Sequence, residues 1–277
     1  MDIYHHADMA GRRPRVCAYM TTMTTHAPAR SLLADPGFGP LPGLLLILTA
    51  VTGVVDAVSI LALGRVFVAN MTGNVVFAGF ALAGAPGFSL SASLFALAGF
   101  LAGAAAGGTL ITRSGRDRAL LLRAGTAAEL ALAAAALLVA GLSGAPGVNH
   151  GTLAMTSGAF GPAVTDTLAA LLAVAMGIQN AVARKLAVPD MTTTVLTMTL
   201  TGLGADLRAV VRDSRGAAGR AARAALGRRL LVVATMLAGA IAGASLVLDV
   251  SPAAALGLAA GLLTVAFGGA VAAARPR

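Results

Sequence analysis

Charged residues are scarce in this chain, and their scarcity excludes most soluble folds. Only 11% of the 277 residues are charged, while 57% are hydrophobic. A soluble globular domain carries about 25% charged residues. Several apolar runs approach the roughly 20 residues that a helix needs to cross a bilayer, and they do not alternate as the strands of a membrane β-barrel do. The sequence therefore predicts an all-α integral membrane protein.

Cysteine, tryptophan and tyrosine are also rare. Cys17 is the single cysteine, so no intrachain disulfide can form. Trp is absent and both tyrosines lie in the first 40 residues, so phenylalanine must replace the usual interfacial Trp and Tyr. The chain has no HExxH or GxSxG pattern and no His within an apolar run, since His150 falls in a predicted outer loop. We therefore expect no enzymatic activity, no catalytic residues, no cofactor and no metal.

The first 40 residues are the most polar part of the chain. Arginines stand at positions 12, 13 and 15. They are not followed by the apolar core of about 7 to 15 residues that a secretory signal needs. We expect 1–40 to form a disordered cytoplasmic tail.

The net charge of +9 comes from the segments around and between the apolar runs. In a soluble domain such a charge would favour nucleic acid as a partner. Here its position favours a role in membrane topology, so we expect the lipid bilayer as a partner and no nucleic acid. The long apolar runs are 41–63, 88–112, 120–143, 164–185, 229–249 and 252–273, and two shorter runs are 71–84 and 191–205.

The distribution of Lys and Arg distinguishes two topologies. If all eight runs cross, 13 of the 20 basic residues lie inside and 7 outside; if only the six long runs cross, 19 lie inside and Arg65 alone lies outside. The positive-inside rule favours the second topology, with both termini in the cytoplasm. The short runs then return to the side from which they entered. Non-helical backbone at that depth must be buried in protein or line a wet cavity.

The two halves of the chain resemble each other. "GVVDAV" at 53–58 matches "GIQNAV" at 177–182, "NMTGNVV" at 70–76 matches "DMTTTVL" at 190–196, and "LAGFLAGA" at 97–104 matches "LAGAIAGA" at 237–244. Each half holds a span, a re-entrant segment and two further spans. Because three spans separate equivalent points, the halves are predicted to be inverted-topology repeats, a plan found in many secondary transporters. The repeats are 41–143 and 164–273, with an outer loop at 144–163 and a basic cytoplasmic loop at 206–229.

Polar residues gather where each half-length helix is predicted to begin, at Met71 and Met191. If the halves are inverted, these two helix N-termini meet near the midplane with unpaired N–H groups. Asn70 with Thr72, and Asp190 with Thr193, are typical of N-cap chemistry, so simple capping of two short buried helices is the alternative to a binding site. The residues predicted to bind a solute or ion are Asp56, Asn70, Thr72, Asn74, Gln179, Asn180, Asp190, Thr193 and Thr194.

Acidic residues within the spans are costly and so are informative. For Asp56 we consider two roles, which are proton or cation exchange and a neutral carboxyl hydrogen-bonded to a helix backbone. Glu129 is about two turns from Arg123, which permits a proton relay, but a snorkelling or Ser/Thr-paired carboxyl is the favoured interpretation. No Lys or Arg lies deep in a span. That favours a cation, a proton or a neutral polar solute over a bare anion.

Glycines at positions 99, 103 and 107, and at 239 and 243, form GxxxG steps. Such steps let helix backbones approach closely. They serve either the internal packing of the spans, which we favour, or a homodimer.

The segments "GVVDAVSILALGRVFVANMTGNVV" and "GIQNAVARKLAVPDMTTTVLT" resemble the YoaK family of bacterial inner-membrane proteins. The resemblance covers about residues 41–270. It implies a multi-pass protein of the bacterial cytoplasmic membrane, and it supplies no activity, substrate or catalytic residue. The matching positions are Asp56, Asn70, Thr72, Gly73, Asn74, Gln179, Asn180, Thr193 and Thr194.

Two functions therefore remain in competition. The first is a secondary transporter or channel-like permease for a small solute or ion, with a midplane site between the repeats. The second is a non-transporting membrane scaffold or partner subunit, which would tolerate substitution of the predicted site residues.

Overall fold

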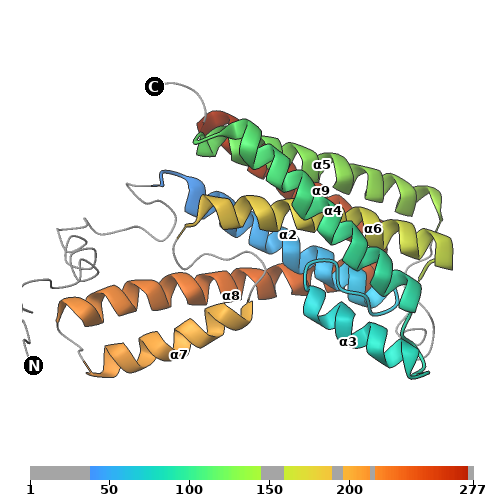
Figure 1. The fold of residues 1–277 in the computed structure, drawn as a ribbon, viewed down its shortest axis with the longest axis horizontal. Coiled ribbons are helices and arrows are strands. Elements are labelled where there is room, and N and C mark those ends of the chain that lie inside the picture. The colour runs from blue at the N-terminus through green and yellow to red at the C-terminus, as the bar shows by residue number, and fades with distance from the viewer. Residues whose placement is uncertain (1–37, 145–158, 189–195, 213–215, 274–277) are drawn as a thin grey trace, which may run out of the picture. The chain divides into compact units, whose positions relative to one another are not determined.

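The computed structural model of the chain describes residues 38–144, 159–188, 196–212 and 216–273 (Figure 1). All of them belong to one compact unit, Ser31–Arg277. Residues 1–37 of the predicted tail, and Asp190, Thr193 and Thr194 of the predicted site, lie outside the described residues. The helices are α2 (Leu41–Ala62), α3 (Met71–Leu82), α4 (Leu90–Ser114), α5 (Arg118–Leu142), α6 (Pro162–Leu186), α7 (Leu196–Arg212), α8 (Ala217–Asp249) and α9 (Pro252–Ala273).

Six of these helices, namely α2, α4, α5, α6, α8 and α9, are long and apolar enough to cross a membrane. They coincide with the six long apolar runs, which confirms the prediction of an all-α, multi-pass membrane protein. The two other helices follow the polar segments. α3 has 12 residues and is about 18 Å long, so it cannot cross a hydrocarbon core of about 30 Å.

The basic segment at 206–229 is largely helical rather than a loop. α7 continues to Arg212 and α8 begins at Ala217. α8 has 33 residues, which gives it a length of about 50 Å. A helix of that length extends well beyond a core of about 30 Å, so the arginines in its first turns can lie outside the apolar layer.

Glycines set the closest helix contacts, and these contacts occur in pairs. A Cβ atom on Gly103 of α4 would lie 2.1 Å from the carbonyl oxygen of Val174 in α6, and one on Gly239 of α8 would lie 2.3 Å from that of Ala50 in α2. These distances leave no room for a side chain. The GxxxG steps of α4 and α8 therefore serve internal packing in this chain.

Glycines of α2 and α6 also contribute to these two helix contacts. A Cβ atom on Gly53 of α2 would meet the backbone of Met236 at 2.3 Å, and one on Gly177 of α6 would meet the backbone of Phe100 at 2.3 Å. The first helix of each half thus packs on the second long helix of the other half. α2 and α6 hold the two halves together through these contacts.

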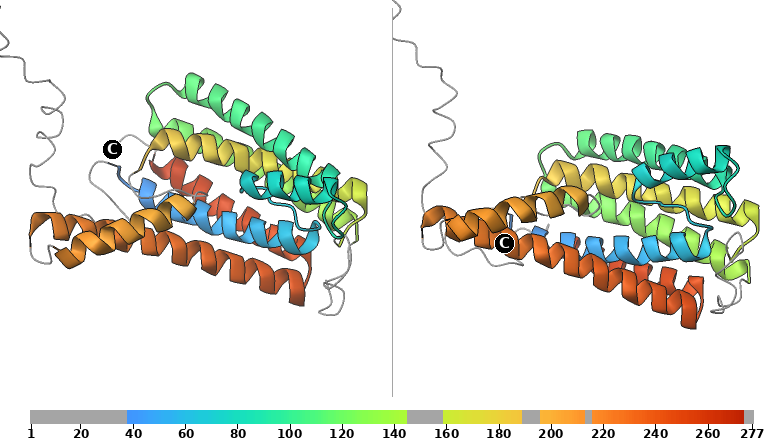
Figure 2. Two further views of the ribbon diagram at one scale, coloured as in Figure 1. Left: turned by 60° about the horizontal axis from the view of Figure 1, so that its bottom comes forward. Right: turned by 90° about the horizontal axis from the view of Figure 1, so that it is seen from below.

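The short helices α3 and α7 begin near each other, without direct contact, and run in opposite directions (Figures 1 and 2). Both start near the middle of the helix bundle. α3 runs to the end of the bundle at which α4 begins, and α7 runs to the other end, at which α8 begins. α3 packs on α4, and α7 packs on α8.

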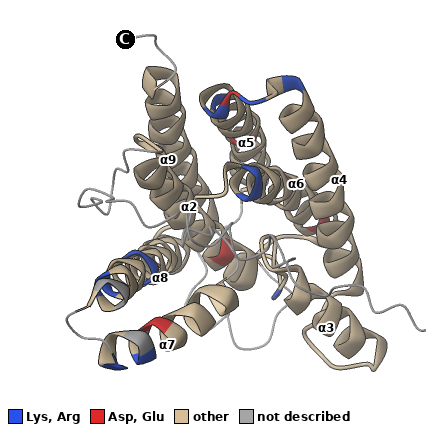
Figure 3. Cartoon of the chain, turned by 60° about the vertical axis from the view of Figure 1, so that its left-hand side comes forward, with Lys and Arg blue, Asp and Glu red and all other residues tan. Residues whose placement is uncertain are grey.

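Basic residues of the described ranges gather at one end of the bundle (Figure 3). They lie on the turn between α4 and α5, at the end of α6, on α7 and on the first part of α8. Arg65 lies at the opposite end, in the turn after α2. The two ends of the bundle therefore differ in charge as the sequence predicts.

Candidate functional site

The chain reverses direction directly after α2. Gly64 and Arg65 both have left-handed backbone conformations, with φ of 76° and 62°. Glycine adopts this conformation without strain, whereas a non-glycine residue there is uncommon. The chain then returns toward the middle of the bundle as a non-helical limb, in which Val66 and Val68 are completely buried. Non-helical backbone at this depth is thus covered by protein, as a membrane protein requires.

Asn74 binds this limb to α3. Its Oδ1 accepts a hydrogen bond of 2.8 Å from the backbone N–H of Phe67, and its Nδ2 donates to the carbonyl oxygen of the same residue. Nδ2 also lies 3.7 Å from the sulfur of Met71. Asn74 has no exposed surface. The hydrogen bonds of its amide are therefore used to hold the limb on α3. This is a structural role rather than the ligand-binding role that the sequence predicted.

The neighbouring Gly73 is needed for the same contact. A Cβ atom at Gly73 would lie 2.3 Å from the ring of Phe67. The ring of Phe67 in turn stacks on Phe77 of α3, with 5.5 Å between the centroids. Phe88, which precedes α4, lies 5.0 Å from Phe77, and the guanidinium of Arg65 lies 5.8 Å from the ring of Phe88. The limb, α3 and the following loop thus form one packed hairpin.

Asp56 connects α2 to the hairpin. Its carboxyl group is hydrogen-bonded by the backbone of Ala69 in the returning limb. Its Oδ1 is buried and has no hydrogen-bond partner among the described residues. Asp56 therefore holds the limb with one side of its carboxyl group and keeps one oxygen available.

Asn70 and Thr72 stand at the start of α3 with exposed side chains. Asn70 occupies the N-cap position, but its side chain makes no capping hydrogen bond. The alternative interpretation, in which the Asn70 side chain simply caps α3, is therefore not supported by the structure. The backbone of Asn70, with φ of −116° and ψ of 88°, does not have the extended geometry typical of a capping residue. The polar groups of the Asn70 and Thr72 side chains are consequently exposed at the start of α3.

Gln179 links the two halves in the core. Its Nε2 donates a hydrogen bond of 2.9 Å to Thr52 Oγ1 in α2. Gln179 Oε1 is buried and has no hydrogen-bond partner in the part of the chain that the structure describes. The next residue, Asn180, donates 2.8 Å to the carbonyl oxygen of Met176 in its own helix. Asn180 is the residue that aligns with Asp56 in the sequence repeat.

Glu129 has an environment that the sequence did not lead us to expect. It neither snorkels nor pairs with a hydroxyl group. Its side chain is 1% exposed, and neither carboxyl oxygen has a partner among the described residues. The nearest hydroxyl along the helix, that of Thr126, donates to the carbonyl oxygen of Leu122 at 2.8 Å. No sequence signal distinguishes a snorkelling from a buried carboxylate at this depth.

The predicted residues are thus brought together in two groups. Asp56, Asn70 and Thr72 lie on or against the hairpin, while Gln179 contacts α2 one turn before Asp56. Within the described residues, no group of three or more His, Cys, Asp or Glu side chains could hold a metal ion.

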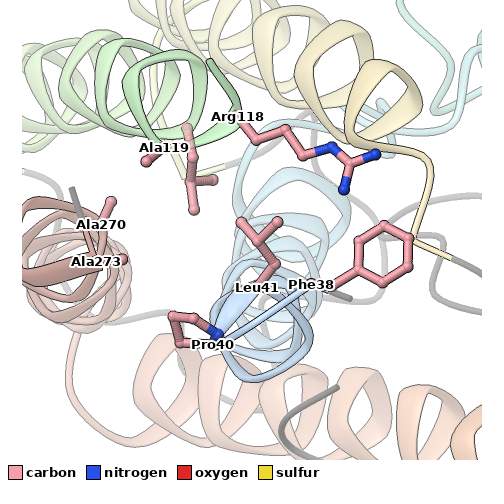
Figure 4. A pocket seen from close by; sticks show the side chains of 8 residues that line it. Phe38, Pro40, Leu41, Arg118, Ala119, Ala270 and Ala273 are labelled. Carbon is pink, nitrogen blue, oxygen red and sulfur yellow. The ribbon is translucent and has the colours of Figure 1, made fainter. Parts of the chain in front are cut away.

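Two pockets of about 200 Å³ lie at the basic end of the bundle, away from these residues. The pocket in Figure 4 lies between the starts of α2 and α5 and the end of α9. The guanidinium of Arg118 lies 4.8 Å from the ring of Phe38 at its edge. The second pocket is lined by Arg116, Lys185 and their neighbours. None of the predicted site residues lines either pocket.

Comparison with known proteins identifies relatives over most of this architecture. Residues 44–269 match the protein family described as "Protein of unknown function (DUF1275)". The chain is 35% identical over 164 residues to UPF0700 transmembrane protein YoaK of Bacillus subtilis (strain 168). That match covers 59% of this chain and 66% of the relative, just under two thirds of its length. No solved structure matches the chain.

Proposed function

The chain belongs to the DUF1275 family, and for this member we propose a secondary transporter or channel-like permease built from two inverted-topology repeats. It carries a small solute or ion across the bacterial cytoplasmic membrane. One observation supports this function above the others: α3 and α7 begin near each other in the middle of the bundle and run to opposite ends (Figure 1). Broken helices in this arrangement direct two helix N-termini at a midplane site in many transporters.

The paired glycine contacts support the inverted repeat. Gly103 meets Val174 and Gly239 meets Ala50, each at the carbonyl oxygen. Val174 follows Ala50 by the same 124 positions that separate Gly177 from Gly53. The second half is inverted across the bilayer relative to the first, because three membrane-spanning helices separate equivalent positions of the two halves.

The charges support an orientation with both termini in the cytoplasm. Arg and Lys lie at the end where α2 begins and α9 ends, and Arg65 lies at the other end. Cytoplasmic segments of membrane proteins are enriched in these residues.

In the proposed site, Asp56, Asn70 and Thr72 supply the polar groups of the first half. Asp190, Thr193 and Thr194 supply those of the second half. Asp56 binds a proton or cation through its available oxygen, and Asn70 and Thr72 contact the solute at the start of α3. Asn180 supplies a further amide, Gln179 lies deeper in the core, and Asn74 keeps the hairpin in shape.

A membrane scaffold or partner subunit is the alternative function. One observation favours it: two pockets lined by described residues lie at the basic end, and neither reaches Asp56, Asn70 or Thr72. A scaffold needs no open path through the bundle.

Electrical recording of purified protein in proteoliposomes tests the two functions. We expect a transient current when the outer solution is exchanged for at least one member of a panel of protons, Na⁺, K⁺, neutral amino acids and sugars. Asp56→Asn should abolish this current while the protein still inserts and elutes as the wild type. Thr109→Ala, an exposed change in α4, is the control and should keep it. A silent wild-type protein across the whole panel would contradict transport and favour the scaffold.

A further inference from the structure

Besides Asp56 Oδ1, three buried oxygen atoms have no hydrogen-bond donor among the described residues. They are both carboxyl oxygens of Glu129 and the Oε1 of Gln179. Both side chains are only 1% exposed. Buried polar atoms of a stable protein are nearly always hydrogen-bonded, so three such acceptors in one region need an explanation.

The packing of α5 on α6 brings the two side chains to one level. A Cβ atom on Gly125 would lie 2.9 Å from Cγ2 of Val182, so these positions face each other. The two helices run in opposite directions (Figure 1). One turn further along α5 is Glu129, and one turn back along α6 is Ile178, followed by Gln179. Glu129 and Gln179 therefore occupy the same layer of the interface.

The orientation of the Gln179 amide is fixed by Thr52. The Thr52 hydroxyl donates its only hydrogen to the carbonyl oxygen of Leu48 at 3.0 Å. Toward Gln179 it can then only accept, so the amide nitrogen must face it, at 2.9 Å. Gln179 Oε1 consequently points away from the Thr52 hydroxyl and keeps its acceptor capacity free.

A proton bound to Glu129 would satisfy the unpaired oxygens of Glu129 and Gln179 better than a metal ion would. An ionised carboxylate and an amide oxygen are both acceptors, and neither can serve the other. A proton taken from water onto Glu129 turns one of its oxygens into a donor, which can bond to Gln179 Oε1. A hard metal cation takes six or more oxygen ligands. The three oxygens are too few for it.

The second half of the chain shows that the fold does not need a carboxyl group here. The buried positions of α5 include Leu122, Glu129 and Ala133. The buried positions of α9 include Pro252, Ala259 and Leu263 at the same spacing, and each buried position of α9 lies 130 residues after a buried position of α5. Ala259 thus occupies the place in α9 that Glu129 occupies in α5, so the carboxyl group is an addition to one half only.

Charged groups on the surrounding helices lie toward their ends. α9 has none, and α4 has Arg113 in its last turn. α6 has Asp166 near its start and Arg184 and Lys185 in its last turn. On α5 itself, Arg123 precedes Glu129 by six residues, about 9 Å along the axis. No charged partner therefore stabilises an ionised Glu129 within the described part of the core.

We propose that Glu129 binds an exchangeable proton, donates it in a hydrogen bond to Gln179 Oε1, and thereby supplies the coupling ion of the permease. The proton-binding step stands on the buried geometry alone, whereas the coupling step rests on the proposed transport function. Release of the proton leaves a carboxylate on Glu129 and requires transient access of water to the α5–α6 interface.

Infrared spectroscopy of the full chain in lipid nanodiscs tests proton binding. Protein labelled with ¹³C-glutamate should show a carboxylic-acid C=O band that is isotope-sensitive and absent from Glu129→Gln. Gln179→Leu should shift this band to higher frequency because the hydrogen bond is lost. Asp56→Asn should leave it in place. Absence of the band from the wild type, or its persistence in Glu129→Gln, would overturn the proposal, as would a band that Gln179→Leu does not move.

Folding is controlled with Glu129→Leu, which replaces the carboxyl group with an apolar side chain of similar size. We expect this variant to insert and to be at least as stable to heat as the wild type. Loss of folding in Glu129→Leu would mean that the carboxyl group is a structural requirement, and would contradict the proposal.

Coupling is tested separately with a pH-sensitive dye inside proteoliposomes. We expect an imposed pH gradient to drive proton flux in the wild type and at least tenfold less in Glu129→Gln. If the band is present but the wild type carries no proton, coupling is overturned while proton binding stands. If solute flux is found and Glu129→Gln keeps it at every pH, the permease stands and coupling through Glu129 is overturned.

Discussion

The side-chain amide of Asn74 binds both backbone polar groups of Phe67, accepting from its N–H over 2.8 Å and donating to its carbonyl oxygen. The amide side chain thus makes the same two hydrogen bonds to the backbone that a residue of a neighbouring β-strand would make. It satisfies a backbone segment that has neither helix nor sheet partners. A re-entrant segment in a lipid environment needs such a device because an unsatisfied backbone group costs several kcal/mol there.

Replacing Asn74 with Ala should therefore open the hairpin. Two buried backbone groups lose their partners, and we expect a loss of about 3 kcal/mol in the free energy of unfolding. Denaturation of the purified protein in mixed micelles measures this loss. A cysteine placed at the buried Val68, in a Cys17→Ser background, should become reactive to maleimide in the Asn74→Ala variant only.

Thr72→Ala is the matched control on the same helix. Its side chain is exposed, so stability should change by no more than about 0.5 kcal/mol. Transport should nevertheless fall, since Thr72 belongs to the proposed site. Equal destabilisation by Asn74→Ala and Thr72→Ala would contradict the role assigned to Asn74.

The close helix contacts predict that Gly103→Ala and Gly239→Ala destabilise the protein to a similar extent. Each added methyl group meets a backbone carbonyl oxygen at about 2.1–2.3 Å, so the helices must separate. We expect a cost of about 1–3 kcal/mol for each change, measured as thermal unfolding in detergent. Gly108→Ala, where a Cβ atom has nothing within 4 Å, should be neutral or gain up to about 1 kcal/mol in helix propensity. A neutral Gly103→Ala would disprove the tight α4–α6 contact.

The ion pair between Arg229 and Asp206 should fix α7 on α8. Arg229 Nη1 lies 2.6 Å from Asp206 Oδ2, and the two side chains are 20% and 19% exposed. In a double-mutant cycle with Asp206→Asn and Arg229→Gln, we expect a coupling energy of about 1 kcal/mol that decreases at high salt. Arg212→Gln, an exposed change on α7, serves as the control. A coupling energy of zero would show that other contacts hold α7.

Cysteine labelling of intact cells tests the re-entrant path of α3. In a Cys17→Ser background, Ala85→Cys follows α3 and Arg116→Cys lies in the turn between α4 and α5. We expect a membrane-impermeant maleimide to label position 85 from outside and position 116 only after permeabilisation. Arg113 and Arg118 keep the positive charge of that turn. Labelling of position 116 from outside would refute the orientation.

The all-α membrane fold followed from composition and run length, because lipid leaves few alternatives for satisfying the backbone. The helix bounds were predicted within a few residues for five of the six spans. The exception is α8, which begins at Ala217 rather than near 229. Hydropathy detects only the part of a helix that lies in lipid, so the basic turns before it were assigned to a loop.

The roles of the predicted site residues were harder to predict. The sequence grouped Asn70, Thr72 and Asn74 together as polar residues near one helix start. The structure separates them, since Asn74 faces inward to Phe67 while Asn70 and Thr72 are exposed. Whether Asp56, Gln179 and the others bind a solute remains a prediction.

By itself, the sequence determined the environment of this protein, the number of its long apolar helices and the internal likeness of its halves. These properties depend on local composition and on patterns that repeat along the chain. Only the tertiary structure decided that Gly103 packs against Val174, that Gln179 binds Thr52 and that Glu129 lies buried among acceptors. Each of these contacts depends on which faces of distant helices pack together. Because the surface of each helix is almost uniformly apolar, the sequence of a single helix does not specify which of its faces contacts which neighbour.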